Sequence, residues 1–452
     1  MPPSLPNVLW LMTDEHRTDS LGCYDSPWAR TPCLDRLASE GVVFESAATP
    51  SPVCVPARVS LLSGMLPHQT GVLSNAYSDT TWRPLTDIFH EHGYQSASFG
   101  KQHYLRSDAF ETSGNHVLSE AVHYFGYEKG RSHEDYSGVR YPREDRQWVF
   151  AGRFPEDPAR AAEAEVVESS WEWLNQRDPS RPFFLRVSFN GPHTPVVAPG
   201  PFDDMLDADA ISVPGASAPI PDDAPRWVRE FLRDAQGSHR LTEAELRRAR
   251  QCYYGLVSFL DSQFGRIVDR METAGLLEDT IVAFVSDHGA HLGDHGMMQK
   301  QTFYEPVVTV PYFYWAPGRI AAGARARRPV ETLSLMPTLL DLAGLPVPDY
   351  CRDLSLASAL GTGEEPPERP VISEISQGTW GYRPEDRLVM VRRGEWKLVL
   401  FYDGPATDPM SERADASLYN LDADPLELTN LIRAPEHSDL IASLIADIAA
   451  RD

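Results

Sequence analysis

Four short segments of this chain are predicted as buried strands, and each is followed directly by polar or charged residues. The segments are Val8–Met12, Gln95–Phe99, Phe183–Phe189 and Thr280–Val285. Short runs of this kind are typical of strands in a parallel sheet that is covered on both faces. An amphipathic helix is predicted between two of them, from Asp157 to about Gln176. The chain is therefore predicted to be an α/β protein with a large mixed, mostly parallel sheet flanked by helices.

The residues that follow these strands form the first group of candidate functional residues. They are Asp14 and Glu15, Lys101 and His103, His193, and Asp287 and His288. Open α/β sheets bind their ligands outside the carboxyl ends of the strands. Each residue alone has a plainer explanation, because a single Asp often caps a turn and a single Lys or His is usually solvated. Together they predict one site at one edge of the sheet.

Residues 51–64 predict a short helix that brings Cys54 to the same site. Pro56 suits the first turn of a helix, and Gly64 suits its end. Cys54 is then expected just ahead of the helix N-terminus, where free N–H groups and the helix dipole favour an anion. Arg58 follows one turn later and can reach the same anion. The alternative is that Cys54 is a small buried packing residue, as most free cysteines are.

The pattern Cys54-x-Pro56-x-Arg58, followed by Ser63-Gly64, resembles the signature of the type I sulfatases, which belong to the alkaline-phosphatase-like superfamily. Further matching segments are Gly100-Lys101-Gln102-His103, Pro192-His193-Thr194-Pro195, Gly293-Asp294-His295-Gly296, Lys300 and Tyr304-Glu305. The resemblance runs from Asn7 to the last predicted helix and is weakest in residues 107–156 and 200–238.

This resemblance implies a chemistry and a role for each candidate residue. In the family, a maturation enzyme oxidises the signature cysteine to formylglycine, whose hydrated form is the nucleophile. The implied ligands of one divalent cation are Asp14, Glu15, the residue at position 54, Asp287 and His288. The other implied roles are His103 as base, His193 as partner of the leaving-group oxygen, and Arg58, Lys101 and Lys300 as cations that neutralise oxyanions. Asn75, Lys101, His193 and Lys300 are expected to contact the substrate, although a lone Asn in a polar loop also suits a turn.

Two residues depart from the common family pattern and leave a second function open. Glu15 stands where Asp is usual, and His288 stands where Asn is frequent. Oxygen ligands suit calcium, magnesium or manganese, whereas a nitrogen ligand favours manganese or zinc, so calcium or manganese is expected. Histidine also occurs at this position in related phosphonate monoester and phosphodiester hydrolases, which are the alternative. The pair Lys101 and His103 favours a sulfatase. A non-catalytic anion-binding relative is disfavoured, because every catalytic position is filled.

The end of the chain is predicted to form a second, smaller unit. Strands are expected at Val371–Ile375, Leu388–Val391, Trp396–Phe401 and Leu418–Leu421, with a tight turn at Arg393-Gly394 and a terminal helix lined by Leu440, Leu444, Ile445 and Ile448. We therefore expect a catalytic domain in residues 1–365 and an antiparallel-sheet subdomain in residues 366–452. The stretches 107–156 and 195–238 lack clear periodicity and are predicted as loops. The first is expected to be either a lid or surface padding.

Charge and composition limit the partners of this chain. Its 41 basic and 65 acidic residues give a net charge of −24, which argues against binding to nucleic acid or to an anionic membrane. A small sulfate ester must therefore be held by a local group of cations. The five cysteines are odd in number and scattered, which argues against a disulfide framework. No leader-like segment and no run of about 18 apolar residues is recognisable, so a cytoplasmic protein is expected. A homo-oligomer is compatible with the sequence.

Overall fold

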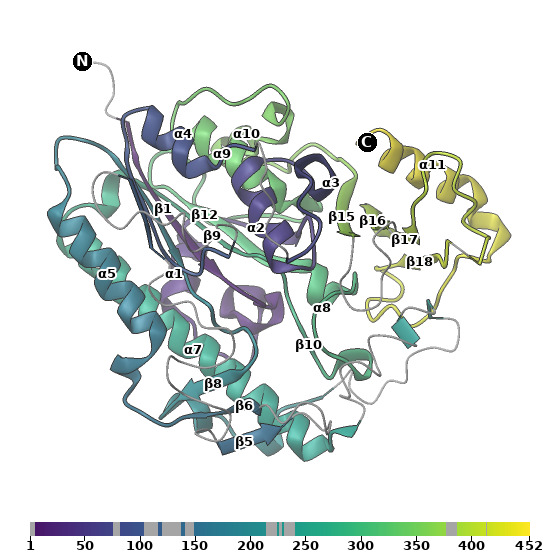
Figure 1. The fold of residues 1–452 in the computed structure, drawn as a ribbon, viewed down its shortest axis with the longest axis horizontal. Helices are drawn as coiled ribbons and strands as arrows, with labels where there is room; N and C mark the ends of the chain where they lie inside the picture. The colour runs from purple at the N-terminus through teal and green to yellow at the C-terminus, as the bar shows by residue number, and fades with distance from the viewer. Residues whose placement is uncertain are drawn as a thin grey trace.

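A mixed β-sheet forms the centre of the molecule (Figure 1). The structure is a computed structural model that describes residues 5–75, 82–103, 116–119, 137–140, 149–213, 224–225, 228–229, 240–376, 387–412 and 414–452. Within these residues the sheet has nine strands, which are β1 (Asn7–Thr13), β2 (Val42–Ala48), β3 (Gln95–Gly100), β4 (His116–Ser119), β7 (Phe183–Ser188), β9 (Thr280–Ser286), β12 (Thr309–Trp315), β13 (Ala324–Ala326) and β14 (Val330–Glu331). All four strands that precede the predicted site residues are present.

The strand order is β13-β2-β12-β9-β1-β7-β3-β4, with β14 also paired to β2. β1 pairs in parallel with both β7 and β9, and β3 pairs in parallel with β7 and β4. β12 pairs antiparallel with both of its neighbours, β9 and β2. The prediction of a large, mixed and mostly parallel sheet is therefore confirmed.

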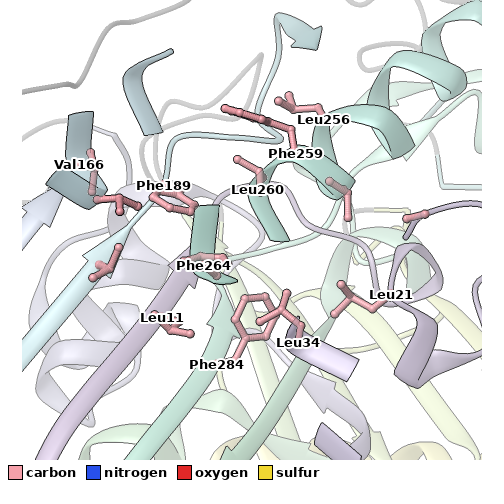
Figure 2. Packing of buried hydrophobic residues seen from close by; sticks show 14 of the residues in the cluster. Leu11, Leu21, Leu34, Val166, Phe189, Leu256, Phe259, Leu260, Phe264 and Phe284 are labelled. Carbon is pink, nitrogen blue, oxygen red and sulfur yellow. The ribbon is translucent and has the colours of Figure 1, made fainter. Parts of the chain in front are cut away.

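Helices cover both faces of this sheet, because the strands are apolar on both sides. In β1, Leu9 and Leu11 join one buried cluster, while Val8, Trp10 and Met12 join another. The first cluster includes side chains from α1 (Pro32–Glu40), α5 (Ala162–Gln176) and α7 (Glu243–Thr273). Figure 2 shows its centre, where Phe264 of α7 lies over Leu11 and Phe284 of the sheet. The second cluster includes side chains from α2 (Cys54–Ser63), α4 (Leu85–Glu91), α9 (Leu335–Leu342) and α10 (Ala357–Thr362).

A separate antiparallel sheet follows at the end of the chain, on the right of Figure 1. Its strands are β15 (Val371–Ser376), β16 (Arg387–Arg393), β17 (Trp396–Phe401) and β18 (Ser417–Asn420), paired in that order. Gly394, with a φ of 57°, forms the predicted turn between β16 and β17. One face packs against α11 (Ser438–Ala449), and the other joins a cluster with residues of the main body such as Phe303 and Val308. The sheet and its helix are as predicted, and the boundary at residue 365 stays a prediction.

Two stretches that were predicted as loops contain short strands. β4 lies in the first stretch, and β5 (Ser137–Arg140) and β6 (Val149–Phe154) follow it there. β8 (Val196–Pro199) lies in the second stretch and pairs in parallel with β6, which itself pairs antiparallel with β5. The loop prediction was wrong for these segments because distant pairing, not local periodicity, makes them strands. Most of residues 107–148, including the predicted lid, lies outside the described residues.

The remaining described α-helices and strands are short. They are α3 (Pro67–Thr70), α8 (Glu305–Val308) and the paired strands β10 (His291–Leu292) and β11 (Met298–Gln299). Of the helices that the structure describes, none is both long enough and apolar enough to cross a membrane.

Candidate active site

The predicted site residues lie together at the carboxyl edge of four neighbouring parallel strands. β9, β1, β7 and β3 are adjacent in the sheet, and they end before Asp287, Asp14, His193 and Lys101 respectively. The backbone links these ends further, since the Asp287 N–H donates to the Thr13 carbonyl at 3.3 Å. Parallel strands bring their ends to one edge, so residues that are far apart in sequence become neighbours.

Helix α2 brings Cys54 into this group from one face of the sheet. The helix begins at Cys54 itself, with Val53 as its N-cap, so Cys54 lies in the first turn rather than ahead of it. Gly64 ends the helix in the left-handed region at a φ of 69°. All ten helical residues are buried. Asn75 does not approach the carboxylates in any hydrogen bond of the described structure; its Oδ1 accepts the Val55 N–H at 3.1 Å and so satisfies a free donor of the first turn.

Arg58 connects the two strand-end aspartates. Its guanidinium is fully buried and donates from Nε to Asp287 Oδ2 and from Nη2 to Asp14 Oδ2, both at 2.8 Å. Nη1 donates to the Lys101 carbonyl at 2.8 Å and to Ser188 Oγ at 3.0 Å. These four contacts engage the guanidinium with protein groups. Arg58 is therefore placed to orient the carboxylates, and its predicted role as a cation that neutralises an oxyanion stays a prediction.

Four side chains offer donor atoms suited to one metal ion. Donor atoms of Asp14, Cys54, Asp287 and His288 all lie within 4.8 Å of one another, and all four residues are buried. The Nδ1 atom of His288 lies 3.0 Å from the Gly289 carbonyl, to which it donates, so Nε2 is the ring nitrogen that faces the cluster and could bind a metal. The set of two carboxylates and one imidazole fits a divalent cation with oxygen and nitrogen ligands.

The electrostatics of the two aspartates also fit a cation. Burial opposes ionisation of Asp14, but Lys101 and Lys300 hold the pKa of its carboxyl well below the usual range. Burial and the negative charge of Asp14 raise the pKa of Asp287 to about 6. Two buried carboxylates that repel each other in this way are stabilised by a divalent ion between them.

The Cys54 thiol has charged neighbours on several sides. Lys300 Nζ lies 3.0 Å, His288 Nε2 3.3 Å and Asp14 Oδ1 3.9 Å from its Sγ atom. Burial and Asp14 oppose ionisation of the thiol, yet Lys300, Lys101 and His288 lower its pKa well below the usual value. An apolar packing cysteine lacks such a setting, because burial alone raises the pKa of a thiol. The surroundings favour the functional interpretation of Cys54 over the packing one.

Lys101, His103 and His193 surround the same centre. Lys101 Nζ lies 2.6 Å from Asp14 Oδ2. His103, at a φ of 54°, is buried, and burial lowers its pKa to about 4 although a hydrogen bond with Cys54 acts in the opposite direction. His193 Nε2 lies 4.0 Å from both Asp14 Oδ1 and Glu15 Oε1, and its side chain keeps 18% exposure. His193 is thus at the open side of the site.

Glu15 is beside this metal-type cluster and is not one of its four members. Its Oε1 lies 2.8 Å from Lys300 Nζ, and its Oε2 accepts the Thr194 N–H at 3.0 Å. The extra methylene of Glu relative to Asp lets the carboxylate reach these partners. Lys300 in turn has a pKa well above its usual value, because Cys54, Glu15 and Asp14 outweigh the effect of burial. Glu15 as a metal ligand stays a prediction.

Three residues at the site were not singled out from the sequence. Ser188 accepts a hydrogen bond from Arg58, and Thr49 Oγ1 donates to the Asp287 carbonyl at 2.5 Å. Tyr253 of α7 donates to the Glu15 carbonyl at 2.6 Å. Ser188 is the last residue of β7 and the second-last residue of the predicted strand, which was a usable signal. Tyr253 lies among the buried residues of α7, and nothing in its local sequence distinguishes it from the apolar ones.

Buried cations, carboxylates and the Cys54 thiol at one sheet edge form a site that suits a hydrolase of anionic esters. Residues 6–345 match the sequence profile "Sulfatase", and residues 293–451 match "N-sulphoglucosamine sulphohydrolase, C-terminal". The chain therefore belongs to the sulfatase family, and it is a sulfuric ester hydrolase.

Relatives that match this chain over nearly its full length support its place in the sulfatase family. An arylsulfatase of Clostridium perfringens is 30% identical, with 96% of this chain and 92% of the relative covered. A choline-sulfatase of Rhizobium meliloti is 31% identical, with 95% and 83% covered. Among solved structures, the phosphonate monoester hydrolase of Agrobacterium radiobacter superposes with a TM-score of 0.77 at 21% identity, covering 99% of this chain and 96% of that one. This last likeness establishes the shared fold.

Proposed function

We propose that this chain hydrolyses sulfate esters with the residue at position 54, matured from cysteine to formylglycine, as the nucleophile. The observation that carries the proposal is the convergence of Lys300, His288 and Asp14 on Cys54 Sγ, at 3.0, 3.3 and 3.9 Å. A side chain that reacts with an anionic ester needs cations on one side and a proton acceptor within reach. A maturation enzyme of the host is the partner that this proposal requires.

Asp14, Asp287, His288 and the residue at position 54 would hold one divalent cation, with Glu15 proposed as a further ligand. When bound, the cation supplies positive charge for the ester oxygens, and formylglycine supplies an activated hydroxyl. Calcium or manganese is the proposed metal, and the imidazole of His288 favours manganese over calcium.

The protein's own residues would handle protons and charge. His103 is neutral at pH 7, because its pKa is lowered to about 4, so it can accept a proton from the group at position 54. The ammonium groups of Lys101 and Lys300 flank Asp14 and would neutralise negative charge on the transferred group. His193 lies at the open side and would donate a proton or hydrogen bond to the leaving-group oxygen.

Hydrolysis of phosphonate monoesters or phosphodiesters is the second candidate for this site. It is favoured by one feature, the nitrogen donor of His288 in the metal-type cluster. A sulfate monoester carries one negative charge, and so do these alternative substrates, so net charge alone does not separate them. Phosphate monoesters carry nearly two charges at neutral pH and are repelled more by Asp14, Glu15 and Asp287.

The test combines a mass measurement with a substrate panel. The peptide that contains Cys54 is analysed by mass spectrometry, and the same preparation is assayed with aryl sulfate, choline sulfate, aryl phosphate, a phosphodiester and a phosphonate monoester. We expect a formylglycine-containing peptide and the highest kcat/KM for a sulfate ester. Turnover by a preparation with only unmodified cysteine would contradict the nucleophile. A phosphodiester or phosphonate that is faster at every pH would establish the alternative.

A further inference from the structure

Lys397 is a fully buried lysine that the mechanism above does not use. It lies in β17 of the C-terminal sheet, and its side chain has 0% exposure. Its Nζ atom donates to the Phe303 carbonyl at 2.8 Å and to Glu305 Oε1 at 2.9 Å, and it also pairs with Glu427. Burying an ammonium group without a partner lowers the stability of the folded protein, so the burial of Lys397 depends on these contacts.

Two of the partners of Lys397, Phe303 and Glu305, belong to the segment that carries Lys300. Glu305 begins α8, five residues after Lys300, and its carboxylate also binds Arg392 of β16 at 3.1 Å. The Glu305 N–H donates to Glu427 Oε2 at 2.7 Å. Burial alone would raise the pKa of Glu305, but Lys397 and Arg392 lower it to about 2, so this carboxylate is charged at neutral pH. Lys397 and Arg392 of the C-terminal sheet, together with Glu427 after it, therefore hold residues 303–305 by ion pairs and by hydrogen bonds between side chains and backbone.

The backbone on both sides of Lys300 needs such support. Gln299 has a φ of 67° and Gln301 a φ of 75°, both in the left-handed region that side-chain-bearing residues rarely adopt. Each such residue costs on the order of 1 kcal/mol or more and persists where the surrounding structure determines it. Phe303 adds a packing contact, because it lies in one buried cluster with Val399 and Tyr419 of the C-terminal sheet.

We propose that Lys397 is a positioning residue for Lys300: from the C-terminal sheet it holds the segment that presents the Lys300 ammonium to Cys54 and Glu15. The inference rests on the role proposed above for Lys300. It assigns a function in catalysis to a sheet that contributes none of the candidate site residues itself. A displacement of about 1 Å in a charged group at a reaction centre lowers rates by up to about 100-fold, so the expected effect is measurable.

The test is a double-mutant cycle on the matured protein with its best sulfate ester. Lys397→Met, Lys300→Ala and the double variant are compared by kcat/KM, and their folded fraction is checked by circular dichroism at the assay temperature. We expect Lys397→Met to lower kcat/KM at least about tenfold when Lys300 is present, and less than about twofold when Lys300→Ala is already in place. A similar loss in both backgrounds, or no loss at all, would overturn the inference.

Two further variants keep the result interpretable. If Lys397→Met does not fold, Glu427→Gln replaces it, because this change removes one charge partner of Lys397 and preserves the shape of the side chain. It should show the same dependence on Lys300 with a smaller loss. Arg393→Met is the matched control, since Arg393 of β16 pairs at 2.8 Å with Asp447 of α11. It should leave kcat/KM unchanged. Normal activity of Lys300→Ala alone would contradict the proposed function and not the contact network.

Discussion

At the scale of single residues, Cys54 has the surroundings of a reactive group. We predict that Cys54→Ala lowers kcat by at least about 10³-fold, the scale expected when a covalent nucleophile is lost. The fold should persist, because alanine fits the first turn of a buried helix. Steady-state kinetics and a thermal melt measure both effects. Cys252→Ala, at a buried position of α7, is the control and should keep its activity. Near-normal turnover by Cys54→Ala would contradict the assignment.

A second residue-scale prediction concerns the metal. Asp287→Asn keeps the shape of the side chain but removes the charge that faces Asp14 and His288. We expect metal affinity to fall at least about tenfold, with a parallel loss of activity. Elemental analysis of the purified variant and of the unsubstituted protein measures the bound ion, and titration with manganese and calcium identifies it. Active protein that contains no divalent ion would show that the cluster serves another purpose.

At the scale of elements, helix α7 supports the site through one hydroxyl group. Tyr253 donates to the Glu15 carbonyl at 2.6 Å and accepts the Arg17 N–H at 2.9 Å. Glu15 has a φ of 61°, so its backbone conformation depends on such contacts. Tyr253 therefore places a buried hydroxyl group where α7 passes the residues that follow β1.

We predict that Tyr253→Phe lowers both stability and activity. The change leaves a buried carbonyl and a buried N–H without this partner, which costs about 1–3 kcal/mol of the free energy of unfolding. kcat/KM should fall because Glu15 then holds Lys300 and Thr194 less firmly. Tyr254→Phe is the matched control, because it removes a hydroxyl at the next position of the same buried helix. An equal loss of kcat/KM in both variants would refute a specific role of Tyr253.

At the scale of the whole molecule, buried histidines should make stability depend on pH. Burial lowers the pKa of His291 to about 3 and that of His295 to about 4. An unfolded histidine has a pKa near 6.5. Below about pH 6.5 the unfolded chain therefore binds protons that the folded chain does not. These two histidines should therefore lower the free energy of unfolding as the pH decreases from 6.5 toward 4. Burial raises the pKa values of Asp261 and Glu427 to about 7, which acts in the opposite direction, so the histidine contribution is measured by comparing variants.

This decrease can be measured by urea unfolding between pH 7.5 and pH 5.5. Each histidine contributes a slope of up to about 1.4 kcal/mol per pH unit. His291→Gln should show a shallower dependence than the unsubstituted protein, since one proton-binding difference is removed. Identical slopes for the two proteins would exclude His291 as a source of the effect.

The sequence was sufficient for those features that depend on local pattern. The strands before Asp14, Lys101 and Asp287 could be predicted, and parallel pairing then placed their ends at one edge. The bridging of two aspartates by Arg58 could not be predicted, because it depends on the angle at which α2 crosses the sheet. The pairing of Glu15 with Lys300 could not be predicted from the sequence either. Side-chain contacts between elements far apart in sequence follow from packing, which no local pattern encodes.

The direction of strand β12 affects how the site can change during evolution. β12 is antiparallel to β9, so it starts at the edge where β9 ends. A parallel seven-residue strand would have begun roughly 23 Å away, at the opposite edge. Residues 287–308 therefore leave and re-enter the sheet on the same side, like a long hairpin loop, and carry both His288 and Lys300. His288 and Lys300 can therefore change position relative to each other through this loop while the pairing of β9 with β12 stays the same.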